Sequence, residues 1–324
     1  SYGDGGWPKE IELNFPPNVG TAQDYSNQPV LADLDADGKL EIIVSIPVYE
    51  KGTVYVWKHD GSNFHGWPLD SGDGYTVHIS VGDIDADGDL ELVGVKKNGR
   101  LLIWNSDGSS YMTPEWPKDL PGALSDPVLA DLDRNGDLEI VVQSNSGHVY
   151  VYNHDGSFLS GWPIAVDTPI GSREWAPMSV GDIDGDGIPE IIAAGGSNNA
   201  IYIFHANGSL YDGWPRTLPG SSYTEPVFGD IDGDGKVEIV TTYMNSCVLW
   251  DLPGNYVKST TDWPVFQFDV SHRGKYCFSC KADIDNDGDV DGVDLAMFGD
   301  SADPYLWTER IAEAFGHVSL PIYP

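Results

Sequence analysis

Basic residues are scarce in this chain. The 324 residues include 17 Lys and Arg against 51 Asp and Glu, which gives a formal net charge of −34. A protein this acidic repels phosphate backbones and anionic lipid head groups, so nucleic acid and anionic membrane surfaces are excluded as predicted partners. The sequence also lacks a run of about 18 apolar residues, so no membrane insertion is predicted.

Cysteine is rare as well, with three in the whole chain. Cys277 and Cys280 form a C-x-x-C, but no second pair of zinc ligands lies nearby. Lys281 stands where haem attachment requires a histidine. The plainer interpretation is a disulfide, either between these two cysteines or from one of them to Cys247, with one cysteine left over.

What the sequence does contain is an aspartate-rich loop that returns six times. The loops begin at residues 33, 83, 131, 182, 230 and 283, at separations of 50, 48, 51, 48 and 53 residues. A period near fifty with a fixed motif indicates a repeat architecture.

The residue pattern within each loop predicts a site for a hard cation. Carboxylates at positions 1, 3 and 5 converge on one point, and Gly at position 6 allows the sharp turn. The first five loops add a Glu at position 9. Oxygen-only ligands favour calcium over zinc or copper, and we expect about five or six Ca²⁺ ions. Solvated acidic turns are the alternative, which six equally spaced copies disfavour.

The predicted metal ligands follow directly from these positions. Those of the first five loops are Asp33, Asp35, Asp37, Glu41, Asp83, Asp85, Asp87, Glu91, Asp131, Asp133, Asn135, Glu139, Asp182, Asp184, Asp186, Glu190, Asp230, Asp232, Asp234 and Glu238. Those of the sixth loop are Asp283, Asp285, Asp287, Asp289 and Asp294.

Each of the first five repeats is predicted to form four short strands. In the third repeat the expected strands are 127–131, 138–143, 148–152 and 157–163, with the acidic loop between the first and second. A Trp-Pro pair closes each unit, and we interpret this tryptophan as a filler between neighbouring sheets. Five units of four strands predict an all-β fold, a β-propeller of about five blades.

The sixth repeat departs from this pattern. Its twelfth position is Asp294, which gives the spacing of an EF-hand loop with Asp in place of the usual Glu at position 12. A helical stretch is expected over 305–315. We therefore divide the chain into a propeller over 1–275 and a small, helical calcium-binding tail over 276–324.

The loops resemble known families. The first five are similar to FG-GAP/VCBS repeats, the calcium loops of integrin α-subunit-type β-propellers, over about residues 28–264. Residues 281–298 resemble a dockerin calcium repeat, with one such loop visible where a dockerin has two. The first resemblance implies adhesion, sugar binding or polysaccharide lyase chemistry, and the second implies a cohesin-like partner.

Function is predicted less sharply than fold. A polysaccharide lyase would need a base and a cation on one face, and the candidates are Tyr75, His78, Lys96, Lys97, Arg100, His148, Arg173 and His205. They form no cluster in the sequence, so catalysis is not predicted.

We expect instead a secreted or cell-surface module, because extracellular calcium fills loops of this kind. It would bind carbohydrate or an extracellular protein. The alternatives are a lyase and a structural subunit of an extracellular assembly, joined through the tail or by self-assembly. The expected contact regions are the connections 14–28, 70–78, 167–176 and 219–225, with Tyr25, Tyr75, Trp175 and Tyr223 as candidate anchors.

Overall fold

The fold is known from a computed structural model. It describes residues 29–48, 51–73, 77–96, 98–111, 115–166, 178–194, 199–220, 226–243 and 246–256. The sixth loop, the predicted tail and its cysteine pair, and the four candidate aromatic anchors lie outside these residues. No helix within the described part of the chain has the length and apolarity needed to cross a membrane.

Five antiparallel sheets follow one another along the chain, and each is a simple meander of sequential strands. The first sheet contains β1 (Val30–Ala32), β2 (Glu41–Val48), β3 (Lys51–Trp57) and β4 (Leu69–Asp73). The second contains β5 (Val77–Gly82), β6 (Glu91–Lys96), β7 (Arg100–Asn105) and β8 (Lys118–Asp119). The third contains β9 (Val128–Ala130), β10 (Glu139–Ser144), β11 (His148–Tyr152) and β12 (Ile164–Ala165).

The last two sheets repeat this plan. The fourth contains β13 (Met178–Gly181), β14 (Glu190–Ala194), β15 (Ala200–Phe204) and β16 (Arg216–Thr217). The fifth contains three described strands, β17 (Val227–Gly229), β18 (Lys236–Tyr243) and β19 (Ser246–Asn255). The all-β prediction is confirmed, and four strands per unit is confirmed for four of the five described sheets.

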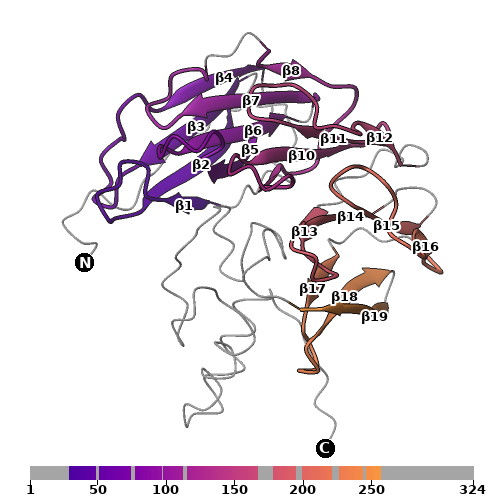
Figure 1. Ribbon diagram of the computed structural model, residues 1–324. Helices are drawn as coiled ribbons and strands as arrows, with labels where there is room; N and C mark the ends of the chain where they lie inside the picture. The colour runs from indigo at the N-terminus through magenta and orange to yellow at the C-terminus, as the bar shows by residue number, and fades with distance from the viewer. Residues whose placement is uncertain are drawn as a thin grey trace, which may run out of the picture.

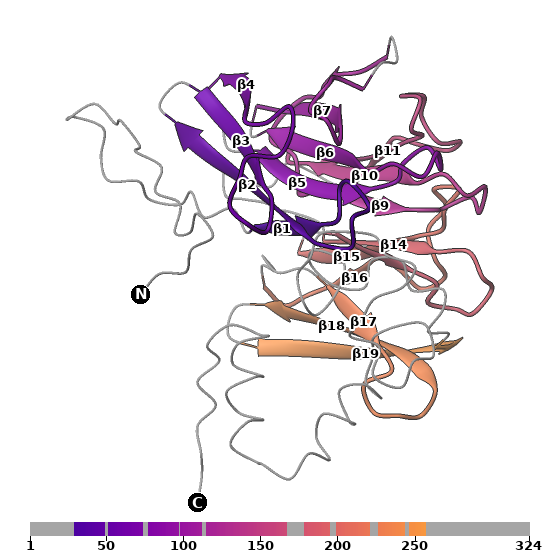
Figure 2. The ribbon, with the colours of Figure 1, turned by 90° about the vertical axis from the view of Figure 1, so that its left-hand side faces the viewer.

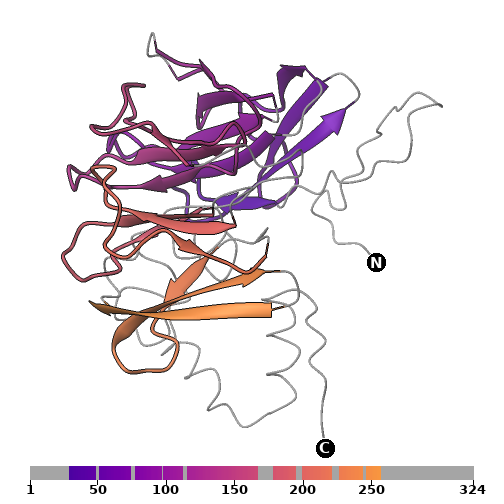
Figure 3. The ribbon, with the colours of Figure 1, turned by 90° about the vertical axis from the view of Figure 1, so that its right-hand side faces the viewer.

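The sheets are arranged along an arc, as the blades of a propeller are. Figure 1 shows the first strand of each sheet toward the inside of the arc and β4, β8, β12 and β16 toward the outside. The inner strands of successive sheets contact one another, from β1 to β5, β5 to β9 and β9 to β13. The side views show the sheets stacked in chain order from indigo to orange (Figures 2 and 3). Buried aliphatic side chains fill the spaces between sheets in three clusters.

The fourth strand of the third repeat was predicted at the wrong place. Residues 157–163 form one isolated bridge, between Tyr152 and Phe158, and then turn away from the sheet. The outer strand is β12, after the Trp-Pro pair instead of before it. The physical reason is that Trp162 turns inward and is buried at 6% exposure, so the chain must leave the sheet to place it.

The tryptophans join neighbouring sheets, as the sequence predicts. The indole Nε1 of Trp67 donates a hydrogen bond to the Ser106 carbonyl at 2.9 Å, and that of Trp162 donates to the Ala206 carbonyl at 2.8 Å. Each acceptor belongs to the hairpin of the following sheet. Gly161 must be glycine because a Cβ there would lie 2.1 Å from the Asn207 carbonyl oxygen.

This contact predicts different costs for two conservative substitutions. Trp162→Phe removes the indole bond and leaves the Ala206 carbonyl without it, which should cost about 1–2 kcal/mol beyond the lost apolar area. Trp214→Phe is the matched control, because the buried Trp214 Nε1 has no hydrogen-bond partner among the described residues. Urea denaturation of both variants should show the larger loss for Trp162→Phe, and equal losses would contradict the assignment.

Candidate functional site: the acidic loops

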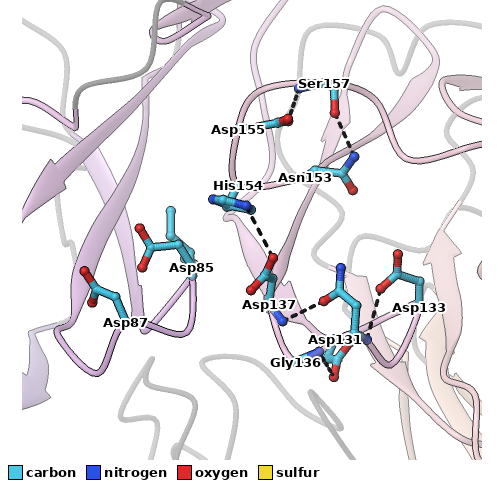
Figure 4. Close-up of polar contacts among 12 residues, drawn as sticks. Asp85, Asp87, Asp131, Asp133, Gly136, Asp137, Asn153, His154, Asp155 and Ser157 are labelled. Carbon is cyan, nitrogen blue, oxygen red and sulfur yellow. Dashed lines mark hydrogen bonds and ion pairs between the residues drawn. The ribbon is translucent and has the colours of Figure 1, made fainter.

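Five acidic loops lie at corresponding places in the five sheets. We number them one to five, and they cover residues 33–41, 83–91, 131–139, 182–190 and 230–238. Each joins the inner strand of its sheet to the second strand, so all five leave the sheets at the same end. Loops two and three lie next to each other (Figure 4), and the Leu138 amide donates to the Ile84 carbonyl across them at 3.1 Å.

The Asp at position 1 fixes the backbone of its own loop. Asp33 Oδ1 accepts from the Asp37 amide at 3.0 Å, and Oδ2 accepts from the Gly38 amide at 2.9 Å. The first Asp of every other loop also accepts two amide bonds from within its loop. These bonds hold the loop in a tight turn that gathers the remaining carboxylates.

Position 4 is left-handed in every loop, a feature that the sequence prediction missed. Ala36, Ala86 and Arg134 have φ between 54° and 58°, while Gly185 and Gly233 occupy the position in loops four and five. The two glycines are the one sequence signal for this conformation, because glycine adopts positive φ without strain.

The Glu at position 9 forms the buried floor of each loop. Its Oε2 accepts a hydrogen bond from the position 2 amide, at 2.9 Å in loop one (Leu34), 2.7 Å in loop three (Leu132) and 2.7 Å in loop five (Ile231). The second carboxylate oxygen, Oε1, is not bonded in this way in two of the loops. Oε1 of Glu41 and Oε1 of Glu139 are both buried with no hydrogen-bond partner. A buried acceptor without a donor is costly, and a bound cation would remove that cost.

Burial changes the acid–base behaviour of these glutamates. It raises the pKa of Glu91, Glu139 and Glu190 from 4.5 to about 8, with neighbouring aspartates adding to the effect. The aspartate at position 3 of loop one shows a shift in the opposite direction, because a hydrogen bond from Lys58 lowers the pKa of Asp35. Without a cation, the carboxylates on the floor of loops two to four are therefore held as neutral acids near neutral pH.

Most of the predicted ligands of loops one to four converge in space, and in loop four His205 joins them. In each group below, one ligand atom per residue lies within 4.8 Å of the others. The groups are Asp33 with Asp35 and Asp37, Asp83 with Asp85 and Glu91, Asp131 with Asp133 and Glu139, Asp182 with Asp184 and Asp186, and Asp184 with Glu190 and His205. The donor set of the first four groups is oxygen alone, which fits a calcium ion.

Three further side chains reach the loops from the hairpin that follows the third strand. Lys58 Nζ lies 2.7 Å from Asp35 Oδ2, the Tyr111 hydroxyl donates to Asp85 Oδ2 at 2.9 Å, and His205 Nδ1 lies 3.1 Å from Glu190 Oε1. Sequence reasoning did not place them there, because they lie 15–26 residues from their partners. The fixed spacing of the hairpin from its loop was the available signal.

His154 lies between loops two and three. Its Nε2 is 3.3 Å from Asp137 Oδ2 in loop three (Figure 4). Its Nδ1 is 3.1 Å from the hydroxyl of Tyr111, the same hydroxyl that donates to Asp85. A chain of contacts therefore joins loop two to loop three through Tyr111 of the second sheet and His154 of the third.

The lyase candidates divide between the two ends of the sheets. His78, Lys96, Arg100 and His148 stand at strand ends opposite the acidic loops, whereas His205 is at a loop. Tyr75, Lys97 and Arg173 lie outside the described residues.

The described candidates other than His148 have structural partners, whereas the buried Nδ1 atom of His148 has no hydrogen-bond partner among the described residues. His78 Nδ1 lies 2.8 Å from Asp126 Oδ1, the Arg100 guanidinium lies 3.7 Å from Asp119 Oδ1, and the buried Lys96 donates to the Ser71 carbonyl. These contacts explain His78, Lys96 and Arg100 as parts of the fold.

The raised pKa values of the glutamates predict that the metal-free protein loses stability as the pH rises, which is the opposite of the usual behaviour of carboxylates in folded proteins. Without metal, the folded state keeps these protons up to a pKa of about 8, whereas the unfolded state releases them near 4.5. The stability from protonation is therefore complete below pH 4.5 and is lost as the pH rises through 8. Calcium requires the ionised carboxylates, so the calcium-loaded protein should show the opposite slope. Thermal denaturation at pH 5 and pH 8, with calcium or with chelator, measures both slopes.

Comparison with known families agrees with the repeats found in the sequence. The model of the FG-GAP-like repeat matches residues 33–94, 140–193 and 182–241, together just over half of the chain. The chain belongs to the FG-GAP-like repeat family. No curated protein sequence matches it.

Several solved structures are similar. The biofilm matrix protein Bap1 of V. cholerae is 20% identical with a TM-score of 0.47, and the match covers 79% of this chain and 42% of that one. A chain in the structure of BBS1N in complex with ARL6DN is 13% identical with a TM-score of 0.44, and the match covers 74% of this chain and 84% of that one. BamB from Moraxella catarrhalis is 15% identical, with a TM-score of 0.44 and coverage of 71% and 61%.

Proposed function

We propose that this protein is a secreted or cell-surface β-propeller whose acidic loops are held together by calcium and which binds a ligand without chemical conversion. The observation that carries the calcium part is the unpartnered, fully buried Oε1 of Glu139, beside Asp131 and Asp133. Those residues would bind the ion in loop three, and their counterparts would bind it in the other loops. Calcium supplies structural charge compensation there, not catalysis.

The binding part of the proposal rests on how the charged residues are used. The loop carboxylates face each other and the loop amides, and the candidates His78 and Arg100 are paired with carboxylates. A histidine and an arginine that are already paired with carboxylates are poorly suited to act as a free general base and a free electrophile. The integrin-like resemblance favours a carbohydrate or an extracellular protein as ligand. The dockerin-like segment supports a cohesin-like or self-assembly partner at the C-terminal end.

A binding assay and a cleavage assay on the same preparation test this function. The full chain, with calcium present, is applied to a glycan array and then incubated with uronate-containing polysaccharides while ultraviolet absorbance is followed. We expect calcium-dependent retention of one class of glycan, or of an extracellular protein partner in a pull-down, without new unsaturated sugar ends.

The lyase alternative predicts a different result. Sustained production of ultraviolet-absorbing ends, abolished by His78→Ala, would overturn the binding proposal and make the end of the sheets opposite the acidic loops catalytic. Large particles in native preparations, without glycan binding, would favour a structural subunit instead.

A further inference from the structure

In loop four a histidine nitrogen joins the cluster of possible metal ligands. His205 Nδ1 lies 3.1 Å from Oε1 of Glu190. Asp184, Glu190 and His205 each offer one ligand atom, and all three atoms lie within 4.8 Å of one another. Asp184 also belongs to the oxygen cluster of the same loop. The imidazole thus faces the position where the ligands of loop four meet.

The equivalent positions in the other sheets show that this histidine is not required by the hairpin. Lys58, Asn105, Asn153 and His205 each begin the turn after the third strand, and each amide donates to the carbonyl four residues later. Asn105 and Asn153 direct their Nδ2 groups to serine hydroxyls within the hairpin, both at 2.8 Å. Asparagine therefore satisfies the turn in two sheets, and His205 has a different use.

The glutamate at position 9 shows which group the His205 side chain faces. In loops one and three its Oε1 is buried without a partner, which marks the buried side of the ligand cluster (Glu41 and Glu139). In loop four the same atom belongs to Glu190, which is 0% exposed, and it faces the imidazole. Tyr211 packs against the imidazole with ring centroids 5.2 Å apart, which restricts its rotation.

This donor set fits a transition metal better than calcium. Calcium takes oxygen ligands, whereas imidazole suits zinc, nickel, copper and iron. Two donors about 2.1 Å from one ion lie at most about 4.2 Å apart, and the 3.1 Å between Nδ1 and Oε1 falls within that limit. The ligand atom of Asp184 lies within 4.8 Å of the other two, so at most a small shift of its carboxylate would bring all three onto one ion.

We propose that loop four takes a divalent first-row transition metal, zinc for example, with His205 as nitrogen ligand and Asp184 and Glu190 as oxygen ligands. The proposal rests on the proposed function, because it assumes that the acidic loops hold metal ions. In this loop the transition metal would take the place of the calcium ion that the proposed function assigns to it, so loop four would have a selectivity that the other loops lack.

The test compares the full chain with two histidine variants. His205→Asn installs the residue found at the equivalent turn in two other sheets, so the hairpin should keep its fold. His65→Asn changes an exposed histidine of the first sheet and serves as control. Each protein is kept in calcium, titrated with Zn²⁺ by calorimetry, and analysed for bound metal. Side-chain ¹⁵N NMR of the histidines then identifies the ligand nitrogen.

We expect the unaltered chain and His65→Asn to bind one Zn²⁺ per chain with a shift of the His205 nitrogen. His205→Asn should bind that ion about 100-fold more weakly or worse, since even indirect partners of a metal contribute 10–100-fold. Equal zinc affinity in all three proteins, or no zinc bound while the loops retain calcium, would overturn this inference alone. A chain that binds no calcium in any loop would instead overturn the proposed function.

Discussion

Chelation of divalent cations is expected to lower the melting temperature by about 20 °C or more. An ion present at about 100 times its Kd stabilises the folded state by about 2.7 kcal/mol. Five such ions exceed about 10 kcal/mol, which is comparable to the typical total stability of about 5–15 kcal/mol. Each kcal/mol corresponds to roughly 2–4 °C for a chain of this size class. Differential scanning calorimetry with calcium and with excess chelator measures the change.

Metal analysis of the chelated sample is the necessary control. An unchanged melting curve in protein shown to have lost its ions would contradict a stabilising role for the acidic loops. Restoring calcium should restore the curve, whereas magnesium should do so less completely because it demands a tighter octahedral set of ligands.

Substitution of Glu139 should have the largest effect of any single loop residue. Glu139→Ala removes a proposed metal ligand and leaves the buried Leu132 amide without its 2.7 Å acceptor. The unpaired amide costs about 1–3 kcal/mol and the lost ion about as much again, so we expect a loss of about 4 kcal/mol in calcium. Denaturant titration of the calcium-loaded protein measures it, with the exposed Glu115→Ala as a control that should change little.

Glu139→Gln separates the two contributions. Glutamine keeps an acceptor for Leu132 but carries no charge, so it should destabilise the protein in calcium. In chelator at pH 8 the sign should reverse, because burial raises the pKa of Glu139 to about 8 and a neutral side chain avoids the buried charge. A Gln variant that is less stable than the parent under both conditions would show that the glutamate acts through packing alone.

The parts of the fold that follow local rules could be predicted from the sequence. The acidic loops were placed correctly between first and second strands because the Asp-x-Asp-x-Asp-Gly pattern forms its own hydrogen bonds, as Asp33 does with Gly38. The role of Trp162 was predicted because a large side chain at a fixed interval needs a large gap to fill.

What depends on contacts between distant segments could not be predicted in the same way. The outer strand β12 lies beyond Pro163 because burial of Trp162 takes precedence over continuing the hairpin. The approach of Lys58 to Asp35 and of His205 to Glu190 depends on the third strand returning alongside the second. The left-handed conformation of Arg134 contradicts its intrinsic preference and is imposed by the loop.

The tryptophan bond between sheets has a consequence for how many units such a chain can contain. Trp67, Trp116 and Trp162 each donate forward, to the sheet that follows in sequence. The contact is therefore heterologous, like the head-to-tail contact between subunits of a cyclic oligomer, and the contact itself sets no limit on the number of units. The angle between successive sheets sets that limit. Duplication of one unit would thus add a complete interface, with its own donor and acceptor, and would extend the arc of sheets by one.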